Sequence, residues 1–322
     1  MHGGTGGLDR TLAGVGGGNQ RARLPKTFTT RGYFRRMTAA KPPALAGLDE
    51  RYAEAKAVRM RYFVGGDGPP LVLVHGLSGA AANWSALAPL LARRHRLLVP
   101  DLPGHGGSAA LPAAPNLSAY AERVRLLMER EGMPAATVVG HSMGAVVALR
   151  LAVVRPDAVS ALVLAGAAGI ASSTRAAEVV LGALGVVRPT RLVAPLRAAV
   201  AQRRLLRHAV FGRIEVADAL SLTVEAVEGL LGSAELHTDL KSAGRALVRD
   251  DPRLDLERVE CPCLVLWGAR DVQVPMTNAF EYARRLRAPL RTIADCGHLL
   301  IAERPEACAA AIADFVAGAA RG

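Results

Sequence analysis

Aromatic residues are scarce in this sequence, and cysteine is scarcer still. Phe, Trp and Tyr make up 4% of the 322 residues, whereas 51% of the chain is hydrophobic. The core must therefore consist mostly of Leu, Val and Ala, and the length suffices for one large or two modest domains. The four cysteines include no Cys-x-x-Cys pair of the kind that binds zinc. We therefore expect neither a disulfide framework nor a metal site.

Two kinds of hydrophobic segment are also missing. No uninterrupted apolar run of about 18 residues is present to span a bilayer, and no apolar stretch follows the basic N-terminal residues as in a secretory signal. We therefore expect a cytoplasmic protein with no stable membrane insertion. Met37 is an alternative start, in which case residues 1–36 would not belong to the native protein.

Acidic residues are outnumbered by basic ones, but the excess is concentrated at one end. The chain has 40 Lys and Arg against 28 Asp and Glu, a formal net charge of +12. Residues 1–41 hold eight of the basic residues and a single acid, Asp9, and they are rich in glycine. This composition predicts a disordered basic tail over residues 1–45. Because the tail has few aromatic residues and no nucleic-acid-binding module, we expect no nucleic-acid partner.

Short apolar runs alternate with amphipathic stretches along the rest of the chain. The runs are continuous, which is typical of strands covered on both faces, and they lie at 58–64, 71–75, 96–101, 137–141, 161–165, 263–267 and 290–294. Helical patterns lie at 118–131, 142–155, 277–286 and 305–316. This alternation predicts an α/β fold: a mainly parallel central sheet with helices on both faces and a ligand site at the carboxyl ends of its strands.

The interval 171–250 departs from this alternation. It contains helical patterns rich in Leu, Val and Ala and no clear strand. We predict a helical lid over the carboxyl edge of the sheet; the alternative is an ordinary helical layer packed on the sheet. The predicted domains are therefore a core of residues 46–170 and 251–322 and a lid of residues 171–250.

The segment GHSMG places Ser142 between two glycines, where an apolar run ends and a helical pattern begins. A serine at such a sharp turn has the geometry of a nucleophile elbow, but its hydroxyl needs a base and a group that orients the base. His298 and Asp271 each follow a later predicted strand, in the chain order nucleophile, acid, histidine. Asp295 is the alternative acid, and we prefer Asp271 because it occupies its own loop after a strand.

Backbone N–H groups beside Ser142 are candidates for an oxyanion hole. The elbow offers the N–H of Met143, and the loop after the run 71–75 offers the N–H of Leu77. We predict that His75 and Gly76, in the same loop, lie at the substrate site.

Two aromatic residues are candidates for substrate contacts. Trp84 is predicted either to line the substrate pocket or to cap the core, and Phe211 is the single aromatic residue of the interval 171–250. His141 precedes the nucleophile and is interpreted as a packed structural residue.

Five motifs occur in a fixed order: HGLSG, DLPGHGGS, GHSMG, WGARDVQVP and CGHLL. Together they resemble the lid-bearing serine members of the α/β-hydrolase superfamily, over roughly residues 58–318. The resemblance implies a Ser142–Asp271–His298 triad that needs no metal and no organic cofactor. Haloalkane dehalogenases and epoxide hydrolases carry an aspartate at the elbow, so the serine argues against both.

The apolar composition of the interval 171–250 favours an acyl or alkyl group. We therefore expect hydrolysis of a small-molecule carboxylic ester or thioester through an acyl-enzyme. The alternatives are a carbon–carbon bond hydrolase of the meta-cleavage type, a cofactor-free haloperoxidase or perhydrolase, and a non-catalytic receptor that uses the fold to bind a ligand. The sequence does not specify an oligomeric state.

Overall fold

The computed structural model describes residues 43–112, 116–170, 193–212, 216–236 and 239–319. The predicted tail lies outside these ranges except for its last three residues. Leu45, one of those three, is buried in an apolar cluster and so belongs to the core. The first part of the predicted lid, residues 171–192, also lies outside the described ranges.

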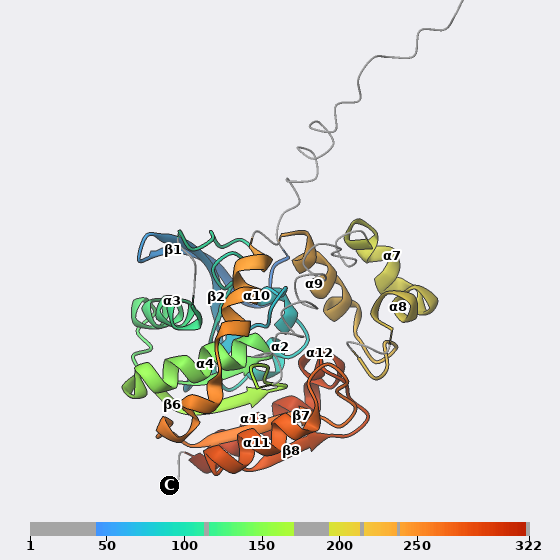
Figure 1. The fold of residues 1–322 in the computed structure, drawn as a ribbon. Helices are drawn as coiled ribbons and strands as arrows, with labels where there is room; N and C mark the ends of the chain where they lie inside the picture. Colours follow the sequence, from blue (N-terminus) through green and yellow to red (C-terminus); the bar gives the residue numbers. More distant parts are fainter. Residues whose placement is uncertain (1–42, 113–115, 171–192, 213–215, 237–238, 320–322) are drawn as a thin grey trace, which may run out of the picture. The chain divides into compact units, whose positions relative to one another are not determined.

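An eight-stranded sheet lies at the centre of the fold (Figure 1). In spatial order its strands are β1 (Asp49–Ala55), β2 (Val58–Gly65), β4 (Arg96–Pro100), β3 (Pro70–Val74), β5 (Ala136–His141), β6 (Val159–Ala165), β7 (Cys263–Gly268) and β8 (Leu290–Ile293). The pairs β1–β2 and β2–β4 are antiparallel, and the other pairs are parallel. The predicted α/β fold with a mainly parallel sheet is confirmed.

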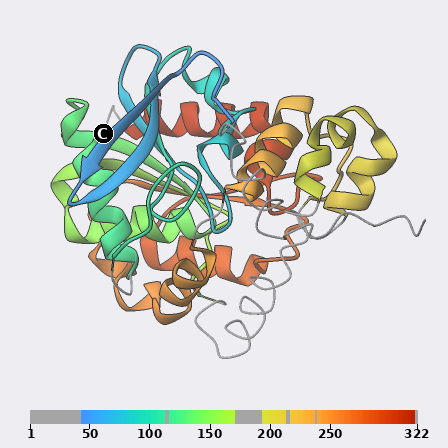
Figure 2. The same ribbon diagram turned by 90° about the horizontal axis from the view of Figure 1, so that it is seen from above.

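Side chains of the central strands alternate between two apolar clusters, one on each face of the sheet. Val138 belongs to the first cluster and Val139 to the second. The first also contains residues of α3 (Leu117–Arg130), α4 (Met143–Val154) and α11 (Met276–Leu286). The second contains residues of η1 (Ala81–Trp84), α2 (Ala88–Leu91), α12 (Leu300–Glu303) and α13 (Pro305–Ala319). Helices therefore cover both faces, as Figure 2 shows from above, and the central strands read as continuous apolar runs.

The edge strand β1 has no continuous apolar run. Only Ala53 and Ala55 of its seven residues are buried. A two-residue turn of Lys56 and Ala57 joins it to β2, and both residues have positive φ, 51° and 61°. Such turns usually carry Asn or Gly, so neither residue signals the hairpin in the sequence.

Between β6 and β7, the described residues form helices and no strand. These are η3 (Ala194–Leu196), α7 (Arg197–Gln202), α8 (Arg204–Phe211), α9 (Val224–Glu235) and α10 (Leu240–Arg249). Residues of η3, α7, α8 and α9 form a third apolar cluster, whereas residues of α10 join the cluster of α3 and α4. The interval therefore has two parts: α10 packs in the layer on the sheet, and α7 to α9 pack in a separate apolar cluster that also includes Leu299 and Ala302. Among the described residues, no helix combines the length and apolar character that crossing a membrane requires.

Candidate active site

Ser142 lies at the turn between β5 and α4. Its φ of 54° and ψ of −118° are rare outside glycine, and such strain costs on the order of 1–3 kcal/mol. The flanking glycines leave room for this turn. A Cβ on Gly140 would lie 2.3 Å from the Gly144 oxygen, and a Cβ on Gly144 would lie 2.2 Å from the Val74 oxygen. Strand, strained serine and helix thus follow one another in the geometry of a nucleophile elbow.

Asp271 and His298 form a buried hydrogen-bonded pair. Asp271 follows β7 and His298 follows β8, and their Oδ2 and Nδ1 atoms lie 2.8 Å apart. The Asp271 side chain is only 1% exposed, and its Oδ1 accepts from the N–H groups of Gln273 and Val274, both at 2.9 Å. Since His298 Nδ1 donates its proton to the carboxylate, Nε2 is the nitrogen with a lone pair that can act as a base.

His298 and Ser142 occupy the same end of the sheet. The Ser142 N–H donates to the Ala165 oxygen at 3.0 Å, and a Cβ on the next residue, Gly166, would lie 3.4 Å from His298 Nδ1. Ser142 Oγ makes no hydrogen bond with any residue that the structure describes. Nucleophile–base hydrogen bonds are often long before a substrate binds. The structure thus joins two members of the predicted triad and places the third nearby.

His141 packs against His298. Their ring centroids are 5.0 Å apart, and His141 Nε2 donates to the His298 backbone oxygen at 2.9 Å. Burial, with a smaller contribution from His298, lowers the pKa of His141 to about 3. His141 is therefore neutral at neutral pH and adds no positive charge beside the imidazolium that would form on His298 during proton transfer. This placement agrees with its interpretation as a structural residue.

The two predicted oxyanion donors flank Ser142. Met143 is the first residue of α4, so no carbonyl within the helix pairs with its N–H. Leu77 follows Gly76, and a Cβ on Gly76 would lie 3.0 Å from Ser142 Cβ. The absence of a side chain at Gly76 therefore lets the loop after β3 lie against the serine.

Comparison with known proteins identifies the family. The model of the alpha/beta hydrolase family matches residues 71–311. The chain belongs to the alpha/beta hydrolase family. The resemblance of the five sequence motifs to the α/β-hydrolase superfamily is confirmed, and the protein is a hydrolytic enzyme of this family. The lid and the Ser142–Asp271–His298 triad stay predictions.

Individual relatives differ in their activities. The chain is 33% identical over 268 residues to a pimeloyl-[acyl-carrier protein] methyl ester esterase of Aromatoleum aromaticum, covering 78% of this chain and 99% of the relative. It is 30% identical to the dihydrolipoyllysine-residue acetyltransferase component of an acetoin cleaving system of Pseudomonas putida; the match covers 79% of this chain but only 65% of that longer relative. A thermophilic esterase from Thermogutta terrifontis has the same fold, with a TM-score of 0.67, 24% identity and coverage of 84% and 99% of the two chains.

A buried polar network supports the loop of His75 in this hydrolase. The Leu102 N–H donates to His75 Nε2 at 2.9 Å, so Nδ1 carries the proton and donates to the Gly76 oxygen at 2.8 Å. Asp101 is fully buried and accepts from the Ala81 N–H at 2.7 Å. Burial raises the pKa of Asp101, and the Arg61 guanidinium 3.1 Å away opposes that rise. His75 is itself fully buried, and its hydrogen bonds hold the loop that carries Leu77.

Trp84 and Phe211 lie inside apolar clusters of the hydrolase. Trp84 is fully buried in the cluster of α2 and α13, and its Nε1 has no hydrogen-bond partner among the described residues. Phe211 is 3% exposed and belongs to the cluster of α7 to α9, together with Leu299. Both aromatic side chains contribute to packing, and we assign neither of them a substrate contact.

Asp295 lies at the surface. Its side chain is 66% exposed and pairs with Arg270 at 2.6 Å. His298 is bonded to Asp271 instead.

Glu303 is a buried carboxylate that the sequence motifs did not single out. It lies at the end of α12, is 2% exposed, and accepts from the Gly297 N–H at 2.8 Å. It also accepts from the N–H groups of Ala217 and Asp218, at 3.2 and 2.8 Å. A Cβ on Gly297 would lie 2.7 Å from the Ala217 nitrogen. Glu303 thus joins the segment before α9 to the residue next to His298.

Replacing Glu303 with Gln is expected to lower the free energy of unfolding by about 1–3 kcal/mol, because an amide nitrogen cannot accept the hydrogen bonds of the carboxylate oxygen that it replaces. Urea denaturation measures the change. Glu306→Gln, at an exposed position in α13, is the matched control and should change stability by less than about 0.5 kcal/mol. Equal effects of the two substitutions would show that the buried carboxylate does not hold the two segments together.

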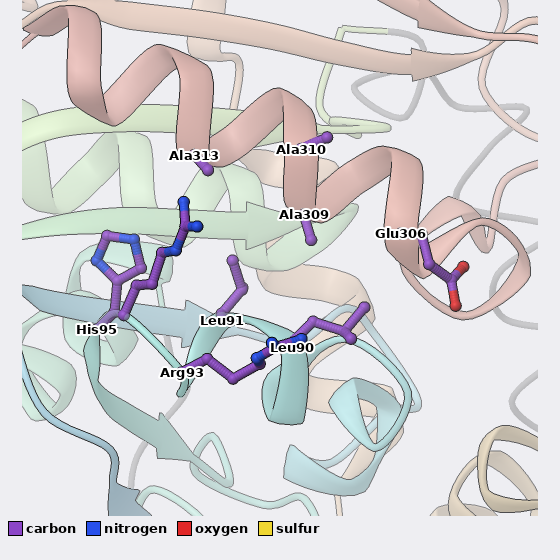
Figure 3. Close-up of a pocket in the computed structure, with 9 residues that line it drawn as sticks. Leu90, Leu91, Arg93, His95, Glu306, Ala309, Ala310 and Ala313 are labelled. Carbon is purple, nitrogen blue, oxygen red and sulfur yellow. The ribbon is translucent and has the colours of Figure 1, made fainter.

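The surface of the hydrolase has a hollow of about 290 Å³, and Figure 3 draws the residues that line it. It lies between α13 and the end of α2, and Leu91, His95 and Ala309 are among its lining residues. It contains none of Ser142, Asp271 and His298, so it is separate from the candidate active site. Across the described residues, no cluster of three or more His, Cys, Asp or Glu side chains is arranged to hold a metal ion.

Proposed function

We propose that this enzyme is a serine hydrolase that cleaves a carboxylic ester or thioester with an apolar acyl or alkyl group. The observation that carries the proposal is the strained Ser142 at the turn from β5 to α4, beside a buried hydrogen-bonded Asp271–His298 pair. The strained backbone at Ser142 lowers the stability of the fold. Such strain is common at active-site residues whose side chains a reaction requires in one orientation.

In the proposed mechanism, His298 Nε2 takes the proton of the Ser142 hydroxyl as its oxygen attacks the carbonyl carbon. Asp271 holds the imidazole in the required tautomer and stabilises the imidazolium. The N–H groups of Leu77 and Met143 donate to the oxyanion of the tetrahedral intermediate. His298 then protonates the leaving alcohol or thiol, and it later activates the water that releases the acyl group from the serine.

The substrate class rests on two observations. The helices α7 to α9 have an apolar core that extends to Leu299, the residue after His298, which suits an acyl or alkyl chain better than a charged group. The Aromatoleum relative, at 33% identity, is an esterase that acts on a methyl ester. Both support carboxylic ester hydrolysis over carbon–carbon bond cleavage, whose substrates carry carboxylates.

We also propose that the helices α7 to α9 are the lid of the site. Two close contacts support this. Val216, just before the segment that leads into α9, belongs to the same apolar cluster as Leu299. A Cβ on Gly297 would lie 2.8 Å from Val216 Cα, so this segment lies directly on the loop of His298.

A series of p-nitrophenyl esters and acyl thioesters of increasing chain length tests the substrate class. We expect measurable turnover with a preference for apolar chains, because those chains bury the most surface against the lid helices. Negligible turnover across the series, together with cleavage of a vinylogous diketone, would replace the ester proposal with carbon–carbon bond hydrolysis.

A further inference from the structure

The helix α8 presents an exposed leucine among basic residues. Leu205 is 86% exposed, more than any other large hydrophobic residue that the structure describes. Arg203, Arg204 and His208 are exposed beside it. We call these four residues the α8 surface. The opposite face of the helix, which includes Phe211, packs in the cluster of α7 to α9, so Leu205 is not needed to hold α8 in place.

The helix α8 lies on the far side of α9 from the sheet. In both views α9 lies between the sheet and the pair α7–α8 (Figures 1 and 2). A second leucine of the same region, Leu196 in η3, is 59% exposed. The two side chains give this end of the fold an apolar character that packing among the described residues does not explain.

The charged residues of the sequence stretch that carries these leucines have one sign. Residues 193–212 include Arg197, Arg203, Arg204 and Arg207 and no Asp or Glu. Arg207 turns inward and donates to the Ala201 backbone oxygen at 2.8 Å. Arg203 and Arg204 form no ion pair with any described residue.

Another exposed leucine has balanced surroundings. Leu254 is 78% exposed, but the neighbouring Arg253 donates to Asp251 at 2.8 Å. The α8 surface therefore differs from the surroundings of Leu254, because the arginines beside Leu205 have no acidic partner among the described residues.

We propose that the α8 surface docks the enzyme peripherally on an anionic lipid bilayer. Leu205 enters the headgroup region, and Arg203 and Arg204 pair with lipid phosphates. Both features strengthen binding to a bilayer, since burial of an apolar side chain and attraction to anionic headgroups each add to interfacial binding. Nucleic acid would pair with the arginines but would leave Leu205 exposed, and this surface has no aromatic side chain on which bases could stack. The docking is independent of the chemistry at Ser142.

Sedimentation of the full chain with lipid vesicles tests the proposal. The vesicles are phosphatidylcholine alone, or phosphatidylcholine with phosphatidylglycerol, each at low and at high salt. We expect binding to the anionic vesicles at low salt and weaker binding at high salt. Leu205→Asp combined with Arg204→Glu should weaken this binding at least about 10-fold, because the variant loses one basic and one apolar side chain and places two acids at the anionic surface.

Leu254→Asp is the matched control, since it removes a leucine of similar exposure whose surroundings are balanced; it should bind like the wild type. Arg203→Gln with Arg204→Gln is a milder second variant. All substitutions are at exposed positions, so thermal unfolding should be unchanged. The basic residues of the first 41 positions are present in every variant and contribute equally.

Three results would overturn the proposal. Equal binding of the wild type to both kinds of vesicle would exclude an electrostatic contribution. Equal binding of the Leu205→Asp, Arg204→Glu variant and the wild type would assign the binding to another part of the chain. Binding to duplex DNA in the absence of vesicle binding would make the surface a nucleic-acid site.

Discussion

Replacing Ser142 with Ala is expected to lower kcat on the best ester substrate by about 10⁴- to 10⁶-fold, by analogy with enzymes that use a serine triad. Without the hydroxyl there is no atom to form the acyl-enzyme, and His298 has no proton to accept from the nucleophile. The fold should persist, because alanine occupies less space than serine and retains the Cβ. Steady-state kinetics on the purified variant measures the loss.

Ser160→Ala provides the matched control for that loss. Ser160 lies in β6 of the same sheet and is exposed, so this substitution should leave kcat within about 2-fold of the wild type, as is usual for surface changes away from a site. A Ser142→Ala variant that kept more than about one tenth of the wild-type activity would contradict the assignment of the nucleophile, because a triad serine contributes orders of magnitude more.

Replacing Asp271 with Asn is expected to lower kcat by about 10⁴-fold, because the neutral amide no longer selects the tautomer in which His298 Nε2 is the base. The geometry of the Asp271–His298 pair supports this expected loss of kcat. The two side chains are hydrogen-bonded at 2.8 Å, and Asp271 is nearly inaccessible to solvent. An amide at this position can donate to Nδ1 instead of accepting from it, which would leave the proton on Nε2 and remove the base.

Replacing Asp295 with Asn tests whether Asp295, the alternative acid in the sequence, has the role that we assign to Asp271. Asp295 is exposed and pairs with Arg270, and exposed ion pairs contribute about 0–1 kcal/mol to stability. Its substitution should change kcat by less than about 3-fold, in line with other surface changes. A larger loss from Asp295→Asn than from Asp271→Asn would reverse the assignment. Both variants are compared on the same ester and at the same pH.

Continuous apolar runs predicted the central strands because those strands are buried on both faces. β5 and β7, for example, have no exposed residue. The same reasoning could not find β1, whose two buried residues, Ala53 and Ala55, alternate with charged ones at the edge of the sheet. It also placed all of the interval 171–250 in one lid, whereas α10 packs with α3 and α4. Helical periodicity indicates an apolar face but not the surface against which that face packs.

The candidate site was more predictable than the packing around it. Ser142, Asp271 and His298 could be proposed from their positions after predicted strands, because the carboxyl ends of parallel strands meet at one edge. Glu303 could not be, since its role depends on the N–H groups of Ala217 and Asp218, which are far from it in the sequence, as well as on that of Gly297. The roles of Trp84 and Phe211 could not be predicted from the sequence either. An aromatic residue near a site has the same sequence signal whether it packs in a cluster or contacts substrate.

Intact-mass spectrometry after incubation with a fluorophosphonate would detect an activated nucleophile at Ser142. The serine oxygen would attack phosphorus and expel fluoride, which leaves a stable phosphonyl group on the protein. We expect one adduct on the wild type and none on Ser142→Ala. No adduct on a folded wild-type protein, or an adduct that persists in the variant, would contradict the assignment of Ser142 as the nucleophile.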